Sequence, residues 1–282
     1  MAPVQDRGVL TVRVGCQFEY EAPGPVPSLW QVRPRADGEH KILSETWETP
    51  GPVRPYLDAF GNGCDRFTLP PGRSVVRYDA QVEVPSSLDE VGTSARAEAI
   101  EDLPNETFVY LLPSRFCWPE LLQSAAWDLF GGTSPGWQRV QAVCDWVHDN
   151  IAYQLGASST LTSAVDVWQS RTGVCRDFTQ LGITLCRALN VPARYIAGYL
   201  PDIAVAPPDL PMDFCSWFEV WLGGRWWTVD PRNNEPRIGR VVIARGRDAL
   251  DTAMVTTWGP AFLQLMTVWA DQVEPGDPAP GS

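Results

Sequence analysis

The segment 173–189 reads Gly173-Val174-Cys175-Arg176-Asp177-Phe178-Thr179-Gln180-Leu181-Gly182-Ile183-Thr184-Leu185-Cys186-Arg187-Ala188-Leu189. Its apolar residues recur at positions 178, 181, 185, 188 and 189, which is the spacing of one face of an amphipathic helix. Asn190 and Pro192 follow the last apolar position and predict the end of the helix. Because Gly173 permits a tight turn into the first helical turn, the segment predicts a central helix that begins at or near Cys175.

A cysteine at a helix N-terminus has a distinctive environment. The unpaired N–H groups and the dipole of the helix favour a thiolate there, and a thiolate is the form that acts as a nucleophile. The sequence therefore predicts Cys175 as a catalytic nucleophile. The alternative is a buried structural cysteine, which is the common fate of a free thiol.

The composition limits the class of protein. The chain has 282 residues, of which 44% are hydrophobic and 20% charged, as in a soluble globular protein of one large or two ordinary domains. Its 26 prolines, 23 glycines and 13 tryptophans favour strands and turns over a helical bundle. A net charge of −12 argues against nucleic acid and anionic membranes, so we expect neither as a partner.

The sequence also predicts a cytoplasmic location. Residues 1–7 hold no apolar signal segment. The uncharged run 252–270 is interrupted by Gly259-Pro260, so we interpret it as strand and loop instead of a membrane span. Seven cysteines without a CxxC pair predict mostly free thiols. We expect no metal site and no cofactor.

The order of patterns along the chain predicts an α+β fold with two domains and a tail. Alternating short strands between Pro- and Gly-rich turns predict an N-terminal β-sandwich domain over residues 1–88. Helical patterns followed by strands predict a core domain over 89–273, and a Pro/Gly-rich tail over 274–282 is expected to be disordered. In the core, helices are predicted over 120–130, 137–150 and 163–169, and strands over 193–200, 214–222 and 225–230. The two histidines are interpreted as structural: His40 in a solvated loop and His148 near the end of the helix 137–150.

Gly223-Gly224 predicts a hairpin with a two-residue turn. Leu222 then faces Arg225, so Trp217 lies opposite Asp230 and Cys215 opposite position 232. Alternation places Cys215, Trp217 and Asp230 on one face of the sheet. If the central helix packs on that face, Cys175, Cys215 and Asp230 converge, in the order of a cysteine–base–acid site.

Three motifs resemble the bacterial transglutaminase-like superfamily, in its transglutaminase-like cysteine peptidase form. Gly173-Val174-Cys175-Arg176-Asp177-Phe178 is similar to the nucleophile motif of that family. Asp213-Phe214-Cys215-Ser216-Trp217-Phe218-Glu219-Val220 is similar to its histidine strand, and Asp230-Pro231-Arg232-Asn233 to its acid motif. Residues 56–62 resemble its β-domain and residues 239–247 its C-terminal strand. The resemblance covers nearly the whole chain and implies a papain-like core, with the central helix packed on an antiparallel sheet.

The chain departs from the family pattern at one position. The family carries histidine where this sequence has Cys215, so the resemblance implies an atypical site of Cys175, Cys215 and Asp230. A thiol is a poor substitute for imidazole as a general base, and losing such a base costs roughly 10²–10⁴ in rate. Amide hydrolysis needs protonation of its leaving group and should suffer most, whereas an activated thioester should suffer least.

Three hypotheses about function follow. The first is an enzyme that uses Cys175 for acyl transfer, condensation or cyclisation of an activated substrate, for example as a step of a biosynthetic pathway. The second is a weak cysteine protease or amidase that uses water or Asp230 as base. The third is a non-catalytic protein whose pocket binds a ligand or whose two thiols respond to redox conditions.

The expected substrate is a small molecule, a peptide or an acyl thioester. Trp217 and Arg176 are predicted to contact it, because Trp217 shares the face of Cys215 and Arg176 follows the nucleophile. Core packing is the alternative for Trp217, and an exposed or paired guanidinium the alternative for Arg176. The sequence predicts no oligomeric state.

Overall fold

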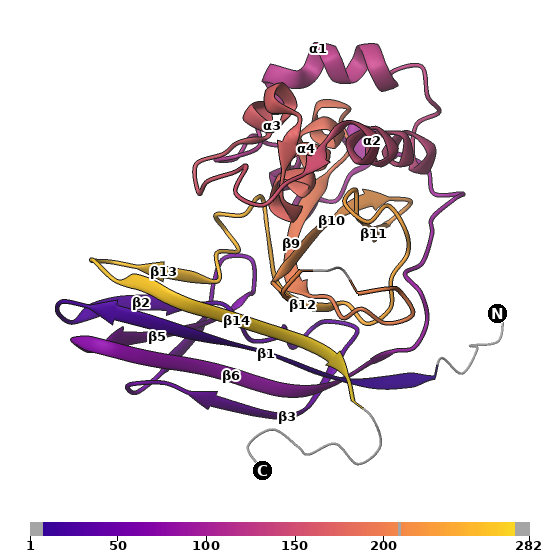
Figure 1. Ribbon diagram of the computed structural model, residues 1–282. Helices are drawn as coiled ribbons and strands as arrows, with labels where there is room; N and C mark the ends of the chain where they lie inside the picture. Colours follow the sequence, from indigo (N-terminus) through magenta and orange to yellow (C-terminus); the bar gives the residue numbers. More distant parts are fainter. Residues whose placement is uncertain (1–7, 208–209, 274–282) are drawn as a thin grey trace.

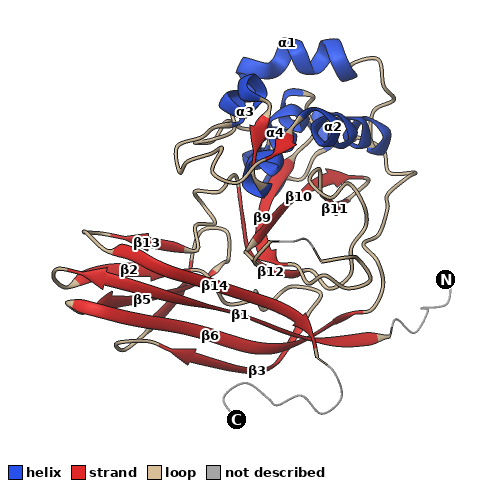
Figure 2. Cartoon of the chain, in the orientation of Figure 1, coloured by secondary structure: helices blue, strands red, loops and turns tan. Residues whose placement is uncertain are grey.

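The computed structural model describes residues 8–207 and 210–273 (Figure 1). A β-sandwich forms one end of the molecule, and a sheet covered by helices forms the other (Figure 2). The fold is therefore mixed and rich in sheet, as the sequence predicted. The predicted tail 274–282 lies outside the described residues.

Two antiparallel four-stranded sheets make up the sandwich. Their inner faces carry alternating apolar residues, which bury one side of each strand. The first sheet has the order β14 (Phe262–Gln272), β1 (Val9–Ala22), β6 (Gly72–Pro85) and β3 (Lys41–Glu48). The second has the order β13 (Val255–Thr257), β2 (Val26–Trp30), β5 (Gly63–Leu69) and β4 (Arg54–Leu57).

The domain boundaries predicted from the sequence are wrong at the C-terminal end of the core. Strand β14 pairs with β1 and β13 pairs with β2, so the chain returns to the N-terminal sandwich (Figure 1). The physical reason is the free edge of each sandwich sheet, which a strand from elsewhere in the chain can cover. Local sequence patterns predict strands at 255–272 but do not reveal their partners.

The second unit is a sheet with helices on one side. Its strand order is β11-β10-β9-β12, and all neighbours are antiparallel. These strands are β9 (Ala193–Tyr199), β10 (Cys215–Leu222), β11 (Arg225–Val229) and β12 (Val241–Gly246). The helices are α1 (Pro119–Phe130), α2 (Trp137–Asn150), α3 (Ala164–Ser170) and α4 (Cys175–Ala188), with 3-10 turns at Ile100–Asp102 and Asn105–Tyr110. Two short parallel strands, β7 (Ala152–Tyr153) and β8 (Thr172–Gly173), lead into α4.

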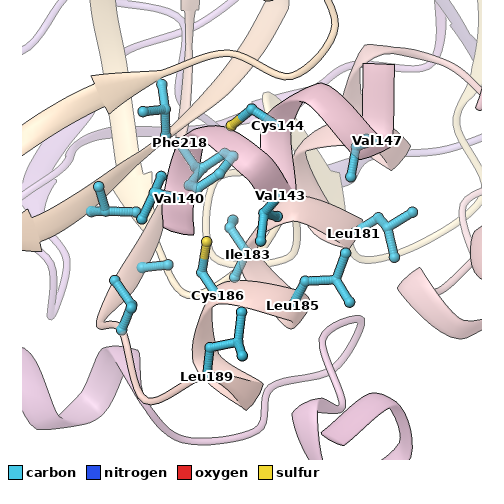
Figure 3. Close-up of a cluster of buried hydrophobic side chains, with 14 of the residues drawn as sticks. Val140, Val143, Cys144, Val147, Leu181, Ile183, Leu185, Cys186, Leu189 and Phe218 are labelled. Carbon is cyan, nitrogen blue, oxygen red and sulfur yellow. The ribbon is translucent and has the colours of Figure 1, made fainter. Parts of the chain in front are cut away.

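Helix α4 is central, and it is more buried than an amphipathic pattern suggests. Every residue from Asp177 to Ala188 is buried, because α1, α2 and α3 cover the sides that do not contact the sheet. Figure 3 shows α2 and α4 packing their apolar side chains together, with Cys186 among them. Polar residues on α4 are therefore buried with partners: the Arg187 guanidinium donates to the carbonyl oxygens of Ala193, Leu112 and Arg247.

The predicted hairpin register is confirmed. Pairs run from Phe218–Val229 to Leu222–Arg225 across the Gly223-Gly224 turn. The predicted packing face is wrong, however. Helix α4 packs on the face that carries Ser216 and Phe218, since Thr179 Oγ1 lies 3.1 Å from Ser216 Oγ. The face with Trp217 points away from α4, because the even-numbered residues of β10 supply the large apolar side chains facing the helix.

The two units share buried contacts. The Tyr199 hydroxyl of β9 donates to the carbonyl oxygen of Val32 at 2.9 Å, and Tyr199, Val241 and Ile243 belong to the apolar core of the sandwich. His40 also lies in this region. Its prediction as a solvated loop residue is wrong: the ring is buried, and burial lowers its pKa. The turn that carries His40 folds towards Arg245 of β12, a contact that the local sequence does not show.

Candidate active site

Cys175 is the first residue of α4, as predicted. Gly173 and Val174 precede it, and the carboxylate of Asp177 accepts a hydrogen bond from the Val174 backbone N–H at 2.8 Å. Asp177 is fully buried and caps the helix, which fixes the backbone around the cysteine. As the first helical residue, Cys175 has a backbone N–H without an acceptor inside the helix.

The expectation that the helix N-terminus favours a thiolate at Cys175 is wrong. Its side chain is half-buried, and burial raises the pKa of the thiol above its ordinary value instead of letting the helix dipole lower it. The thiol donates to the carbonyl oxygen of Phe214 at a distance of 3.9 Å. The charge of Arg232 opposes the effect of burial and lowers the pKa of Cys175. At neutral pH the sulfur is therefore mainly protonated.

Cys215 begins β10 and lies near Cys175. The two thiols are close enough that the charge of Cys175 raises the pKa of Cys215, and the Cys175 thiol donates to the carbonyl oxygen of Phe214, the residue before Cys215. Burial, together with the charges of Cys175 and Asp230, raises the pKa of Cys215 to about 12. Cys215 is therefore a neutral hydrogen-bond donor and has no capacity to accept the proton of Cys175.

Asp230 follows β11 and is buried in a dense set of hydrogen bonds. Its Oδ2 accepts from Arg240 Nη2 at 3.0 Å and from Asn233 Nδ2 at 2.9 Å. Its Oδ1 accepts from the backbone N–H groups of Arg232 and Asn233, each at 3.1 Å. Asp230 thus holds the loop after the hairpin, and the charge of Arg240 balances its own.

Arg232 is the residue of this site that the sequence reasoning did not single out. Its guanidinium lies over the ring of Tyr153, 4.5 Å from the ring centre, and its charge couples to both Cys175 and Cys215. The carbonyl oxygen of Arg232 accepts from His148 Nδ1 at 3.0 Å. The hairpin register, which places position 232 opposite Cys215, contained the signal that could have found it.

Arg176 and Trp217 are each held by contacts within the protein, and Trp217 packs in the same buried apolar cluster as Cys215. The Arg176 guanidinium donates to Ser158 Oγ at 3.1 Å and to Asp177 Oδ1 at 3.4 Å, so neighbouring residues hold it. Trp217 is 1% exposed and lies beneath Arg240, whose guanidinium carbon is 4.7 Å from the ring centre. It borders a cavity of about 340 Å³ on the sheet face opposite α4. These contacts favour packing roles for both residues.

Neither histidine is placed to serve as the base. His40 lies in the sandwich unit, and His148 is exposed on α2, where it contacts the backbone of Arg232. The interpretation of His148 as structural agrees with that contact. Within residues 8–207 and 210–273, no group of three or more His, Cys, Asp or Glu side chains is arranged to hold a metal ion. No helix among the described residues is both long and apolar enough to cross a bilayer.

A cysteine at the start of a buried helix, packed against an antiparallel sheet that supplies the adjacent groups, defines the class of papain-like cysteine folds. Residues 123–231 match the family model of the transglutaminase-like superfamily, and this region of the chain is a domain of that superfamily.

Comparisons with whole proteins extend beyond this domain. A solved structure from Cytophaga hutchinsonii, provisionally named a cysteine protease, is 28% identical with a TM-score of 0.85 and covers 96% of this chain and 93% of its own. An uncharacterized protein of Mycobacterium leprae is 25% identical over 84% of this chain and 88% of its own length. An uncharacterized protein of Mycobacterium tuberculosis is 33% identical over 117 residues, 37% of this chain and 36% of that protein. The likeness to the first structure therefore includes the sandwich as well as the core.

Proposed function

We propose that this chain is an acyl-transfer enzyme in which Cys175 accepts the acyl group of an activated substrate such as a thioester. The proposal rests on one observation: the thiol at a capped helix N-terminus lies beside a second thiol. The resemblance to the family implies a histidine at that second position. A cysteine-based enzyme agrees with the superfamily of the core domain. The substrate preference follows from the absence of an imidazole near Cys175 in the described residues.

The proposed reaction has two steps. The Cys175 thiolate attacks the acyl carbon, a new C–S bond forms, and the C–S bond to the leaving thiolate breaks with its electron pair. Water or an amine then attacks the acyl-enzyme, releases Cys175 as thiolate and loses its own proton to solvent. In this reaction the backbone N–H of Cys175 would stabilise the oxyanion, and the protonated Cys215 would supply a neutral S–H donor near the reacting sulfur.

The leaving group decides which substrates this site can use. An amide nitrogen must be protonated before it departs, and that step requires a general acid near neutral pKa. Cys215, with a pKa raised to about 12, holds its proton too tightly to fill that role. A thioester releases a stable thiolate without protonation. We therefore expect thioester substrates to react far faster than amides with the same acyl group.

The test compares an acyl thioester with the anilide of the same acid. We expect thioester turnover that Cys175→Ala reduces by about 10³-fold or more, because the nucleophile is lost. The matched control is Cys64→Ala, which removes a thiol in the sandwich and should keep the activity. Turnover that survives Cys175→Ala would refute the proposal. Comparable cleavage of the anilide would instead support the protease or amidase activity that the name of the Cytophaga hutchinsonii protein suggests.

A further inference from the structure

Arg232 carries a positive charge that has no carboxylate partner among the described residues. Of the arginines near the loop after the hairpin, Arg240 pairs with Asp230 and Asp89, and Arg237 pairs with Asp202. The guanidinium of Arg232 contacts the ring of Tyr153 instead. Burying a cation without an anionic partner costs free energy, and a bound anionic ligand beside the two thiols would offset that cost.

Hydrogen bonds on both sides hold the backbone of Arg232 in place. Its backbone N–H donates to Asp230, and its carbonyl oxygen accepts from His148 of α2, so the loop is held from both sides. The Tyr153 ring covers one face of the guanidinium, and Tyr153 itself packs against Phe178 in the first turn of α4. Because the ring occupies a face, the in-plane N–H donors remain for a planar anion, and a carboxylate matches that fork.

We propose that Arg232 binds a carboxylate carried by the acyl substrate, which makes an acyl thioester with a second, free carboxylate the preferred substrate class. This inference rests on the proposed acyl transfer at Cys175 and deepens it. Two carboxylates, Asp230 and Asp213, couple through their charges to Arg232, but neither forms an ion pair with its guanidinium. Asp230 pairs with Arg240, and the Asp213 carboxylate accepts from the Phe214 backbone N–H at 2.7 Å. A bound carboxylate would therefore complete the pairing of Arg232.

A pair of alkylating reagents tests the anion site without a substrate. Iodoacetate and iodoacetamide share a leaving group and a size but differ by one negative charge. Each reacts with the thiolate of Cys175, so the ratio of their rates cancels the thiolate fraction and reports only the affinity for the charge. The other six cysteines are buried, and peptide mass mapping identifies the alkylated residue. Since the whole chain carries a charge of −12, its overall field disfavours iodoacetate.

We expect the ratio of iodoacetate to iodoacetamide rates at Cys175 to exceed the ratio for glutathione. Arg232→Gln should lower the ratio about tenfold, as expected for loss of a charge-assisted pair. Arg232→Lys keeps the charge but loses the paired N–H donors of the guanidinium, so its ratio should lie between those of the wild type and Arg232→Gln. Arg73→Gln makes the same change of net charge on an exposed sandwich residue and should leave the ratio unchanged. An unchanged ratio in Arg232→Gln, or a wild-type ratio no higher than that of glutathione, would overturn the inference.

A second measurement separates this inference from the proposed function. We expect the wild-type enzyme to prefer a glutaryl thioester over a pentanoyl thioester by about tenfold in kcat/KM, and Arg232→Gln to remove the preference. If both thioesters react equally and Arg232→Gln changes neither, the carboxylate site is wrong and acyl transfer stands. If neither thioester reacts while the alkylation ratio depends on Arg232, the anion site stands and the proposed acyl transfer fails.

Discussion

At the scale of single residues, the chemistry of the site depends on which groups near Cys175 can accept or donate a proton. Burial raises the pKa of both thiols, and at Cys175 the charge of Arg232 is the largest of the effects that lower it, ahead of hydrogen bonding to Ser216. Asp230 is engaged with Arg240, Asn233 and the loop backbone, so its carboxylate positions the loop more than it relays a proton. An imidazole at position 215 would change this balance, because an imidazolium stabilises a neighbouring thiolate.

The first residue-scale prediction concerns pH. Because the pKa of Cys175 is raised above its ordinary value of 9.0, the thiolate fraction is small at pH 7 and rises about tenfold for each pH unit up to that pKa. The rate of iodoacetamide alkylation at Cys175 should therefore increase steadily from pH 6 to 9 without a plateau. A rate that levels off below pH 8 would contradict this assignment.

The second residue-scale prediction concerns placing a histidine base at position 215. Cys215→His should raise the alkylation rate of Cys175 at pH 7 by about 10- to 100-fold, since an imidazolium lowers the pKa of an adjacent thiol. Cys215→Ser is the control: it matches cysteine in size, supplies no charge and should leave the rate within about threefold. If His and Ser variants react alike, position 215 does not face the nucleophile.

At the scale of secondary structure, the site depends on how closely α4 approaches β10. Gly182 is buried at that contact, and a Cβ added there would lie 2.7 Å from the ring of Phe218. The Cys175 end of the helix is fixed by its cap at Asp177 and by the contact of Thr179 with Ser216. The close helix–sheet contact therefore places the sulfur next to the start of β10.

Gly182→Ala tests this contact. Alanine is the better helix former by about 1 kcal/mol, but overpacking against a buried ring costs about 1–3 kcal/mol, so we expect net destabilisation of up to about 2 kcal/mol. Chemical denaturation measures the free energy of unfolding. Gly132→Ala is the matched control, because a Cβ there meets no atom within 4 Å. Stabilisation by Gly182→Ala would show that the helix has room to move away from the sheet.

At the scale of the whole molecule, the sandwich and the core are joined by polar contacts as well as apolar packing. Asn62 is fully buried, and its Nδ2 donates to the carbonyl oxygen of Arg245 on β12 at 2.8 Å. Its Oδ1 accepts from the Arg245 backbone N–H at 2.8 Å. This residue therefore joins a loop of the sandwich to a strand of the core sheet, as the chain also does when β13 and β14 return to the sandwich.

Asn62→Ala should lower the free energy of unfolding by about 2–4 kcal/mol, because it leaves several buried backbone and side-chain groups without partners. We expect a single transition in calorimetry for the wild-type chain, since the two units share an apolar core. The control is Asn105→Ala, at an exposed position. Two separate transitions in the wild-type chain would show that the units unfold independently.

Much of the fold was predictable because it depends on local patterns. Apolar spacing predicted α2 and α4, Ser163 predicted the start of α3, and Gly223-Gly224 predicted the hairpin and its register. Each of these signals lies within a few turns or a single strand, where helical and strand periodicity act directly. For the site, the same reasoning located the cysteine at the helix start and a thiol and a carboxylate on the neighbouring hairpin.

The sequence by itself determined the elements, the hairpin register and the position of Cys175 at the start of a helix, because periodicity, glycine and capping act between neighbours in the chain. Only the tertiary structure decided that α4 packs on the Ser216 face, that β13 and β14 complete the sandwich, and that the Cys175 thiol is protonated beside Arg232. These features arise from burial and from charges that meet across long sequence separations. Desolvation depends on what covers a group, and no local pattern records it.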